Sequence, residues 1–373
     1  MRHDLVYAKT NNSIQLFILF SLSFVLFVIA AFRPLGIDND SLTYESEIVA
    51  FYKGNSEIKE PIFIAFSYIS EKIFNENTRV VFILYAALSV FFKTYAIAQY
   101  SKKILLSLVV YAGMFFILHE MTQIRVGLAS SFFLLAIPDL IKGDRKRYTI
   151  KILLASLCHF SAVILLPLVF LSSKKINFSL VFLSPLIMLT LILFIGDMNP
   201  ILISIFRYLP EPFSTKAISY IVGVEQFGRF DEVNIFSKFT LSAFAFFILY
   251  LYACTKSSIT ADDIIFLKLF SIMLTAFYLF SSVPVLASRT FELFAVSFIF
   301  SLPVIATKFK PSWIVSLIIF SWVCLYCYLV NLKLIGIKIN GKKKKTAHNF
   351  VKLEWLKRYT CMLRKHQRHR RIQ

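Results

Sequence analysis

The sequence has few cysteines, and their positions match no disulfide or metal-binding pattern. Only five occur in 373 residues, and four of them lie within apolar runs, at Cys158, Cys254, Cys324 and Cys327. A free thiol in such a run behaves as a small hydrophobic group. Cys324 and Cys327 form a C-x-x-C pair, but on a membrane helix this spacing more simply places two packing residues on one face. The sequence therefore predicts no disulfide framework, metal site or redox site.

Acidic residues are also scarce, at 21 against 41 lysines and arginines. The imbalance is concentrated at the C-terminus, where residues 333–373 contain 14 basic residues and one acid, Glu354, giving a net charge of +13. The rest of the chain carries +7, an ordinary value for a membrane protein with basic loops. The basic segment has no zinc-ligand spacing and no nucleic-acid-binding motif. We expect it to contact anionic lipid headgroups rather than nucleic acid.

Polar stretches are few because most of the chain is apolar. Hydrophobic residues make up 58% of the sequence and aromatic residues 16%, and the mean hydropathy is +0.71. A soluble domain buries only the side chains that face its core, so it could not cover this much apolar surface. Apolar runs of about 18 or more residues, each able to cross roughly 30 Å of hydrocarbon, recur along the chain. The sequence predicts an all-α, polytopic membrane helical bundle.

About ten apolar segments are predicted to form this bundle. They cover residues 13–32, 80–98, 103–119, 122–141, 148–171, 178–196, 234–254, 263–282, 286–306 and 312–331. A shorter stretch, 61–74, is only half apolar and is expected to lie in the interface or dip into the membrane. No repeat or low-complexity linker divides the chain, so residues 1–332 are expected to form one transmembrane domain, followed by the basic tail 333–373.

The basic loops predict how the chain crosses the membrane, because short cytoplasmic loops are enriched in Lys and Arg. The basic loops lie at residues 102–103, 142–147, 174–175 and 308–310. All of them face the cytoplasm if segment 148–171 enters and leaves by the same face, breaking near His159 and Pro167. This re-entrant arrangement, which we favour, puts Arg289 on the same extracytoplasmic side as Arg125, and also puts the basic tail outside. If the segment instead spans fully, the tail lies inside and Arg289 faces the opposite side.

Ionisable groups beside apolar segments are costly unless they are paired or face water, so each is a candidate functional residue. The densest group runs from His119 to Arg125, between two apolar segments. On an α-helix, His119 and Gln123 would share a face. Arg125 could hold a phosphate or diphosphate through its planar guanidinium, and His119 or Glu120 could act as a general base or orient one. The alternative is a turn whose charges lie in interfacial water and bond to glutamate or backbone.

Two other segments carry acidic candidates. The loop after the first apolar segment contains Asp38 and Asp40, followed by Tyr44. Either aspartate could act as a base or, less readily, bind a divalent ion, although the composition of this loop is equally typical of a plain turn. Glu60 precedes Pro61, and such a carboxylate can also be an exposed group at the start of a helix.

Three further ionisable residues lie in or beside apolar segments. His159 is inside segment 148–171, where a lone histidine is more often a neutral, hydrogen-bonded core residue. Arg289 begins the ninth segment, where it either pairs with Glu292 one helical turn away or forms a second anion clamp opposite Arg125. Lys93 lies near a segment end and is expected to extend its amine to the interface.

The order of these elements resembles the EpsG branch of the Wzy-type polysaccharide polymerases. The resemblance covers about residues 30–300. In the first half of this range it is carried by Asp38 with Tyr44, by Glu60-Pro61, and by the stretch from His119 to Arg125, which is followed by Gly-Leu-Ala after one residue. In the second half it is carried by His159, which precedes an apolar stretch that contains proline, and by Ser288-Arg289. It implies a multi-pass glycosyltransferase of the bacterial inner membrane, with an architecture like that of the GT-C enzymes and a cavity open to the extracytoplasmic side. The basic tail departs from the pattern of the family.

The resemblance also implies a reaction and its participants. The enzyme would join oligosaccharide repeats carried on undecaprenyl diphosphate, without a cofactor or metal. The implied roles are diphosphate binding by Arg125 and Arg289 and proton transfer by one of Asp38, His119, Glu120 or His159. We expect Tyr44, Glu60, Gln123 and Glu292 to support these residues. The expected partners are the lipid-linked oligosaccharide and bacterial membrane lipids, and could extend to other polysaccharide-assembly proteins, but do not include nucleic acid.

Two other functions are compatible with a polytopic protein of this kind. A flippase for the same lipid-linked sugars would need charges along a path through both leaflets and pseudo-symmetric halves, and the sequence shows no corresponding halves. A membrane O-acyltransferase with His119 as its base would need access to an acyl donor, for which no second motif is present. The polymerase is therefore the favoured hypothesis.

Overall fold

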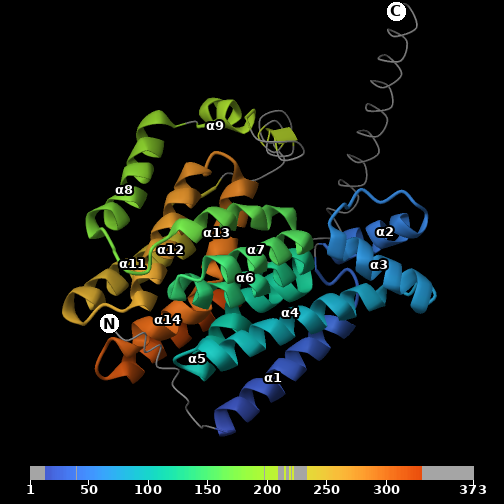
Figure 1. Cartoon of the computed structure of the whole chain (residues 1–373), viewed down its shortest axis with the longest axis horizontal. Coiled ribbons are helices and arrows are strands. Elements are labelled where there is room, and N and C mark those ends of the chain that lie inside the picture. Colours follow the sequence, from blue (N-terminus) through green and yellow to red (C-terminus); the bar gives the residue numbers. More distant parts are fainter. Residues whose placement is uncertain are drawn as a thin grey trace, which may run out of the picture. The chain divides into compact units, whose positions relative to one another are not determined.

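The computed structural model describes residues 13–329 except for 39, 197, 209–213, 216–217, 220 and 222–232. The chain divides into two compact units, residues 1–323 and 324–373. Of the second unit, only residues 324–329 are described, so the basic tail expected at 333–373 lies outside the described residues. In the part of the chain that is described, the regular elements are helices (Figure 1).

Seven helices among the described residues are long and apolar enough to cross a membrane. They are α1 (Ser13–Phe32), α4 (Arg79–Tyr100), the combined α5 (Ile104–Val110) and η1 (Tyr111–Thr122), α6 (Ile124–Lys142), α8 (Phe178–Ile195), α11 (Lys238–Lys256) and the helix Ser312–Leu329. The pair α13 (Pro284–Ala295) and α14 (Phe298–Thr307), bent by 52°, makes an eighth span if it is counted as one. The protein is therefore a multi-pass helical membrane protein, as predicted.

The two remaining predicted segments are also helical, but neither is a simple apolar span. Segment 263–282 corresponds to α12 (Ala261–Leu279), whose first turn contains Asp262 and Asp263. Segment 148–171 is split into α7 (Arg145–Cys158) and the 3₁₀ helix η2 (Phe160–Phe170). The prediction of about ten segments thus corresponds to seven or eight full spans plus these elements.

The break in segment 148–171 falls at His159, where it was predicted. His159 has extended backbone angles, φ −156° and ψ 121°, so α7 ends at Cys158. The two halves pack side by side, and the hydroxyl of Tyr148 donates to the carbonyl oxygen of Leu165 at 2.7 Å. The segment therefore forms a helical hairpin that returns toward the end where it began, which is the geometry that a re-entrant segment requires.

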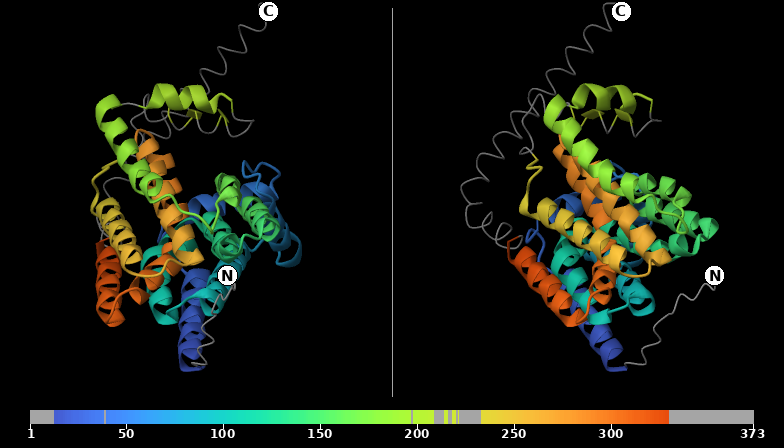
Figure 2. Two further views of the ribbon diagram at one scale, coloured as in Figure 1. Left: turned by 60° about the vertical axis from the view of Figure 1, so that its left-hand side comes forward. Right: turned by 90° about the vertical axis from the view of Figure 1, so that its left-hand side faces the viewer.

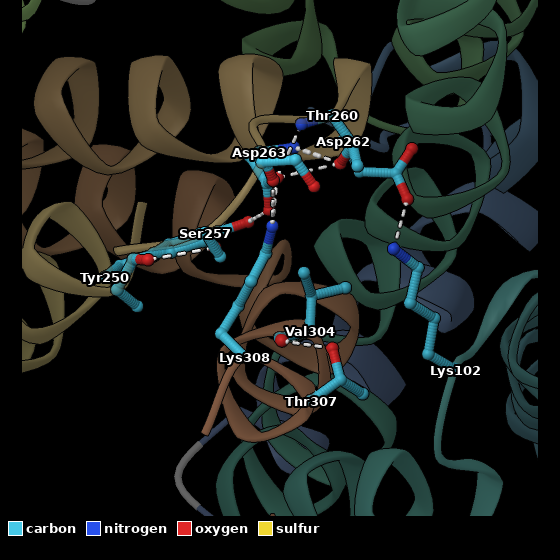
Figure 3. A network of polar contacts seen from close by, with 11 residues as sticks. Lys102, Tyr250, Ser257, Thr260, Asp262, Asp263, Val304, Thr307 and Lys308 are labelled. Atoms are coloured by element: carbon cyan, nitrogen blue, oxygen red, sulfur yellow. Dashed lines mark hydrogen bonds and ion pairs between the residues drawn. The ribbon is translucent and has the colours of Figure 1, made fainter. Parts of the chain in front are cut away.

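One end of the helical bundle is rich in lysine, and we call it the lysine end. Here Lys102 pairs with Asp262 at 2.8 Å and Lys308 with Asp263 at 2.5 Å, and Figure 3 shows both amines reaching the start of α12. Tyr250, from α11, also donates to Asp263 at 2.9 Å (Figure 3). These contacts tie together the α4–α5 turn, the α11–α12 turn and the end of α14.

The hairpin also reaches the lysine end. Lys268, one turn and a half beyond Asp263 on α12, donates to the carbonyl oxygens of Ser172 and Lys175 at 2.6 and 2.8 Å. The Lys103 amine donates to the hydroxyls of Ser312 and Ser316 at 3.1 and 2.9 Å. The basic loops at 102–103, 174–175 and 308 are thus brought to one end of the bundle, as the re-entrant arrangement requires.

The opposite end contains Arg33, Arg79, Arg125 and Arg289, and we call it the arginine end. Arg33 follows α1 and donates to the carbonyl oxygen of Met121 at 2.6 Å, while Arg79 at the start of α4 donates to the carbonyl oxygen of Arg33 at 2.9 Å. The termini of α1, α4, η1 and α6 therefore meet here. The apolar helices between the two ends appear in two further orientations in Figure 2.

Two short helices cover the arginine end. α2 (Ser41–Tyr52) and α3 (Pro61–Ile73) follow α1 and precede α4 (Figure 1). Tyr44 of α2 and Phe63 of α3 belong to one buried cluster with Tyr85 of α4 and Cys158 of α7. The predicted half-apolar stretch 61–74 is therefore a helix packed against the bundle, and it fixes Glu60 at its N-terminus.

Close packing between η1 and α6 leads to a first prediction. A Cβ atom at Gly127 would lie 2.2 Å from the carbonyl oxygen of His119, so only glycine fits there without a backbone shift. In an open helix Gly→Ala stabilises by about 1 kcal/mol, but here Gly127→Ala is expected to destabilise by about 1–3 kcal/mol, as overpacking does. Thermal unfolding of the detergent-solubilised protein shows whether the substitution lowers or raises Tm, and a raised Tm would contradict the packing described.

Candidate functional site

The segment from His119 to Arg125 forms a corner between two helices. η1 is a π-helix that ends at Thr122, and Gln123 leaves the helical region with φ −104° and ψ 59° before α6 begins at Ile124. π-helical turns are rare and occur frequently at functional sites. The corner turns Gln123 and Arg125 toward the arginine end, while His119 and Glu120 remain inside the bundle.

Arg125 is the centre of the first cluster of polar residues. Its Nη1 atom lies 2.8 Å from Oε2 of Glu60, and its guanidinium lies over the ring of Tyr44, 5.3 Å from the centroid. The other oxygen of Glu60, Oε1, lies 3.0 Å from Nδ1 of His159. The structure thus brings together Tyr44 from α2, Glu60 before α3, Arg125 from α6 and His159 from the break in the hairpin. The Nε atom of Arg125 is buried and has no hydrogen-bond partner among the described residues.

The charge state of Glu60 fixes the tautomer of His159. Burial by itself raises the pKa of Glu60, but the hydrogen bond with His159 and the positive charge of Arg125 outweigh it and lower the pKa to about 2. Glu60 is therefore ionised at neutral pH and can only accept hydrogen bonds. Nδ1 of His159 must carry the proton that it donates to Glu60, so in the neutral imidazole Nε2 carries the lone pair.

The lowered pKa of Glu60 predicts a pH-dependent stability. A carboxylate whose pKa is lowered by folding stabilises the protein above its ordinary value of 4.5, and this contribution is lost as the pH falls through about 2. Glu60→Gln is expected to lower Tm at pH 7, and the difference from wild type should narrow at pH 3. The matched control is Glu57→Gln, an exposed position in the same loop. Equal pH profiles for wild type and Glu60→Gln would contradict the assignment.

Arg289 is the centre of the second cluster. It lies on α13, is exposed, and its Nη1 atom donates to Oε1 of Gln123 at 2.9 Å. The Nε2 atom of Gln123 donates to Oε2 of Glu292 at 3.2 Å. Gln123 therefore bridges Arg289 and Glu292, which the sequence suggested could pair directly. Since Arg125 is two residues beyond Gln123, the two arginines expected to form an anion clamp lie at the same end of the bundle.

Asp40 connects the two clusters electrostatically. Burial raises the pKa of Asp40 above its ordinary value, and the negative charge of Asp38 adds to this rise, while the positive charges of Arg289 and Arg125 act in the opposite direction. Both guanidinium groups are thus close enough to one carboxylate to influence its ionisation. Tyr44 is in the electrostatic reach of the same two arginines. Asp40 and Tyr44 therefore lie in a region that Arg125 and Arg289 share.

Asp38, a candidate base, is engaged in the turn that precedes α2. Its Oδ1 atom accepts from the backbone N–H groups of Asp40 and Ser41 at 3.1 and 2.8 Å, and its Oδ2 atom accepts from Nε of Arg33 at 3.1 Å. Arg33 also donates to the carbonyl oxygen of Ala30 at 2.6 Å. The carboxylate of Asp38 therefore orders the turn and anchors Arg33, which agrees with the turn chemistry considered from the sequence.

Glu120, a second candidate base, is fully buried in an ion pair. The Nζ atom of Lys93 lies 2.7 Å from Oε1 of Glu120, and it also donates to Oγ of Ser89 and to the carbonyl oxygen of Gly127, both at 2.8 Å. Tyr111 donates to the same carboxylate at 3.2 Å. The expectation that Lys93 extends to the interface is wrong, because its side chain is 0% exposed.

His119, a third candidate base, is also buried. Its Nδ1 atom lies 3.2 Å from Oγ of Ser130, whose hydroxyl donates to the carbonyl oxygen of Gly127 at 2.7 Å. These contacts hold the imidazole of His119 inside the bundle. The expectation that His119 and Gln123 share a helix face does not hold. His119 packs inside the bundle, whereas Gln123 contacts Arg289.

The buried ion pair leads to a prediction for stability. Lys93→Met is expected to destabilise the protein by about 3–5 kcal/mol, because it leaves Glu120 buried without its counter-charge. Lys93→Met/Glu120→Leu should recover most of this loss, since an apolar pair of similar volume removes the unpaired group. Thermal unfolding in detergent compares the Tm of the single variant with that of the double variant. If the double variant is as unstable as Lys93→Met, the pair does not act as described.

Two polar residues at this site were not predicted correctly from the sequence. Lys93 was assigned to the interface, and Arg33 was not recognised as a candidate. A lysine four residues after a serine inside an apolar segment is a weak signal, and the partner Glu120 lies in another helix. Within the described part of the chain, no group of three or more His, Cys, Asp or Glu residues is arranged to hold a metal ion.

Comparison with known proteins gives a family match. The model of the EpsG family matches residues 16–342, a range that contains all the candidate residues described above. No curated protein matches the chain, and no solved structure matches it.

Proposed function

Because the chain belongs to the EpsG family, we propose that it joins undecaprenyl-diphosphate-linked oligosaccharide repeats into a polysaccharide at the extracytoplasmic face of the bacterial inner membrane. Family membership supports a polysaccharide polymerase-like membrane protein that acts on lipid-linked substrates. The undecaprenyl diphosphate carrier, the joining of repeats and the extracytoplasmic side go beyond family membership and are part of the proposal.

The observation that carries the proposal is the placement of Arg125 and Arg289 at one end of the bundle. Arg289 donates a hydrogen bond to Gln123, two residues before Arg125. Burial raises the pKa of Asp40, and the charges of both arginines oppose this rise. A lipid diphosphate is a compact anion with several oxygens, and paired guanidinium groups bind such oxygens through parallel hydrogen bonds. Arg289 is exposed, so its guanidinium can reach such an anion.

The distribution of charge supports an outward-facing site. The lysine end carries Lys102, Lys103, Lys268 and Lys308, and loops rich in lysine face the cytoplasm in most membrane proteins. The arginine end is at the opposite side of the bundle and would then face out. A substrate that has already crossed the membrane would meet Arg125 and Arg289 there.

In the proposed reaction, a hydroxyl of the acceptor repeat attacks the anomeric carbon of the donor chain. A new glycosidic C–O bond forms while the bond between that carbon and the diphosphate oxygen breaks, and the electron pair leaves with the lipid diphosphate. Arg125 and Arg289 stabilise the negative charge that develops on this leaving group. The acceptor proton passes to Nε2 of His159, whose ring is oriented by Glu60.

We assign different roles to the other candidate residues. His119 and Glu120 position the η1–α6 corner from inside the bundle, and Asp38 orders the turn that carries Asp40. Tyr44 packs on the guanidinium of Arg125. In the second cluster, Gln123 holds Arg289 and is itself held by Glu292.

The proposal is tested by supplying purified protein with an undecaprenyl-diphosphate-linked oligosaccharide in detergent. A polymerase forms products longer than one repeat and releases undecaprenyl diphosphate, and both can be followed by gel electrophoresis and mass spectrometry. A flippase makes no glycosidic bond under these conditions, but moves the lipid across the bilayer of a proteoliposome. Lipid translocation without chain extension would overturn the proposal.

A further inference from the structure

We infer that a basic cavity at the lysine end binds the phosphate-bearing headgroup of an anionic phospholipid. The cavity lies where the turn between α6 and α7 meets the end of η2, and its volume is about 340 Å³. This falls within the range of about 300–1,000 Å³ typical of ligand sites. Its polar lining includes Arg145, Ser172, Ser173 and Lys174. The inference does not depend on the proposed polymerase activity.

The charge of the lining favours an anion. Arg145 comes from the start of α7 and Lys174 from the segment after η2, so the two arms of the hairpin each contribute one cation. Neither takes part in an ion pair among the described residues. The acid in the lining, Asp144, is engaged elsewhere, because it accepts from the backbone N–H of Arg147 at 3.0 Å and pairs with its side chain at 3.3 Å.

The hydroxyl groups in the cavity suit phosphate oxygens. Ser172 and Ser173 both line it, and a phosphate accepts hydrogen bonds from hydroxyls as well as from cations. The backbone around Ser172 is fixed, because Lys268 donates to the carbonyl oxygens of Ser172 and Lys175 at 2.6 and 2.8 Å. On the facing arm, Tyr148 lines the cavity and is anchored by its bond to Leu165 at 2.7 Å. The cavity is therefore formed before a ligand binds.

The surroundings of the cavity indicate a lipid rather than a free anion. Phe170, between the lining residues Val169 and Leu171, is 76% exposed, and Leu153 on α7 is 50% exposed. Apolar side chains exposed on a membrane helix face acyl chains. Basic pockets between membrane helices on the cytoplasmic side are favourable for anionic headgroups. A phospholipid can place its headgroup in the cavity and its chains against this apolar surface.

The test uses the full-length protein in an uncharged detergent, titrated with dioctanoyl-phosphatidylglycerol. Dioctanoyl-phosphatidylcholine and inorganic phosphate are the two comparison ligands. Arg145→Gln/Lys174→Gln removes both lining cations. The matched control, Lys146→Gln/Lys175→Gln, removes the same charge from the adjacent positions, which do not line the cavity. Ser173→Leu fills the cavity without changing the charge.

Arg145→Gln/Lys174→Gln is expected to weaken phosphatidylglycerol binding by about tenfold or more. The control variant, Lys146→Gln/Lys175→Gln, should weaken it by less than about threefold. Ser173→Leu should also weaken binding, and it carries the test if the lining variant fails to fold in a thermal-unfolding assay. Phosphatidylcholine and inorganic phosphate should bind more weakly. Equal losses in the two double variants would indicate diffuse surface charge and overturn the inference. Phosphate that competes as well as the lipid would identify a free-anion site and also overturn it.

Discussion

Arg289→Ala is expected to lower the rate of chain extension by about 100-fold or more, because removing one preorganised donor from a developing anion costs about this much. The side chain is exposed and donates to Gln123, so the substitution should leave the fold intact. Arg289→Lys keeps the charge but loses the planar fork, and it should restore only part of the rate. The measurement is the rate of release of undecaprenyl diphosphate by purified protein.

Arg125→Ala is expected to cause a similar loss, but its interpretation needs a second variant. The substitution leaves Glu60 buried beside His159 without its cation, which can destabilise the protein. Arg125→Ala/Glu60→Gln removes this unpaired charge, and it should recover stability without recovering the rate. The control is Arg147→Ala, whose side chain is 73% exposed at the other end of the bundle. This control should remain within about twofold of wild type. Wild-type rates for both Arg125→Ala and Arg289→Ala would refute the proposed diphosphate site.

His159→Gln is expected to lower the rate of chain extension by about 100-fold or more, since a positioned general base contributes roughly this factor. Nδ1 of His159 bonds Oε1 of Glu60 at 3.0 Å, so glutamine can keep a hydrogen bond to Glu60 but cannot accept the acceptor proton. Glu60→Gln should cause a smaller loss, because it changes the orientation of the base and not the base itself. The rate should be measured with saturating donor so that the chemical step is observed.

His119 provides a matched control for His159. Both are single histidines in apolar segments, but His119 is fully buried against Ser130. His119→Gln is expected to lower Tm while the rate per folded molecule falls by less than about tenfold. If His119→Gln abolishes chain extension in folded protein and His159→Gln does not, the two assignments must be exchanged.

The apolar runs were sufficient to predict the membrane helices, because a span needs a continuous hydrophobic stretch of known length. The break at His159 could be predicted for a related reason, as a polar residue followed by Pro167 cannot continue an apolar helix without cost. The number of spans was harder to predict. α12 begins with Asp262 and Asp263, whose partners Lys102 and Lys308 come from distant loops, and a linear count of hydrophobic residues cannot show that these charges are paired.

The site was predicted only in part, and the reason is helical register. His119 and Gln123 would share a face in a helix of 3.6 residues per turn, but η1 is a π-helix and Gln123 lies beyond its end. This change of register turns His119 and Glu120 into the bundle. Lys93 was assigned to the interface because it lies near a segment end, whereas its observed partner, Glu120, is 27 positions away in the sequence. Spacing within one helix cannot reveal such a pair.

Arg125 and Arg289 are proposed to hold one diphosphate group together, and a comparison of undecaprenyl diphosphate binding with undecaprenyl monophosphate binding tests this proposal. Wild-type protein should prefer the diphosphate, and Arg125→Ala and Arg289→Ala should each remove most of this preference. The double variant should lose less than the sum of the single losses, because the two side chains share one ligand. If Arg289→Ala keeps the wild-type preference for diphosphate, the two arginines do not form a common site and the proposed mechanism is wrong.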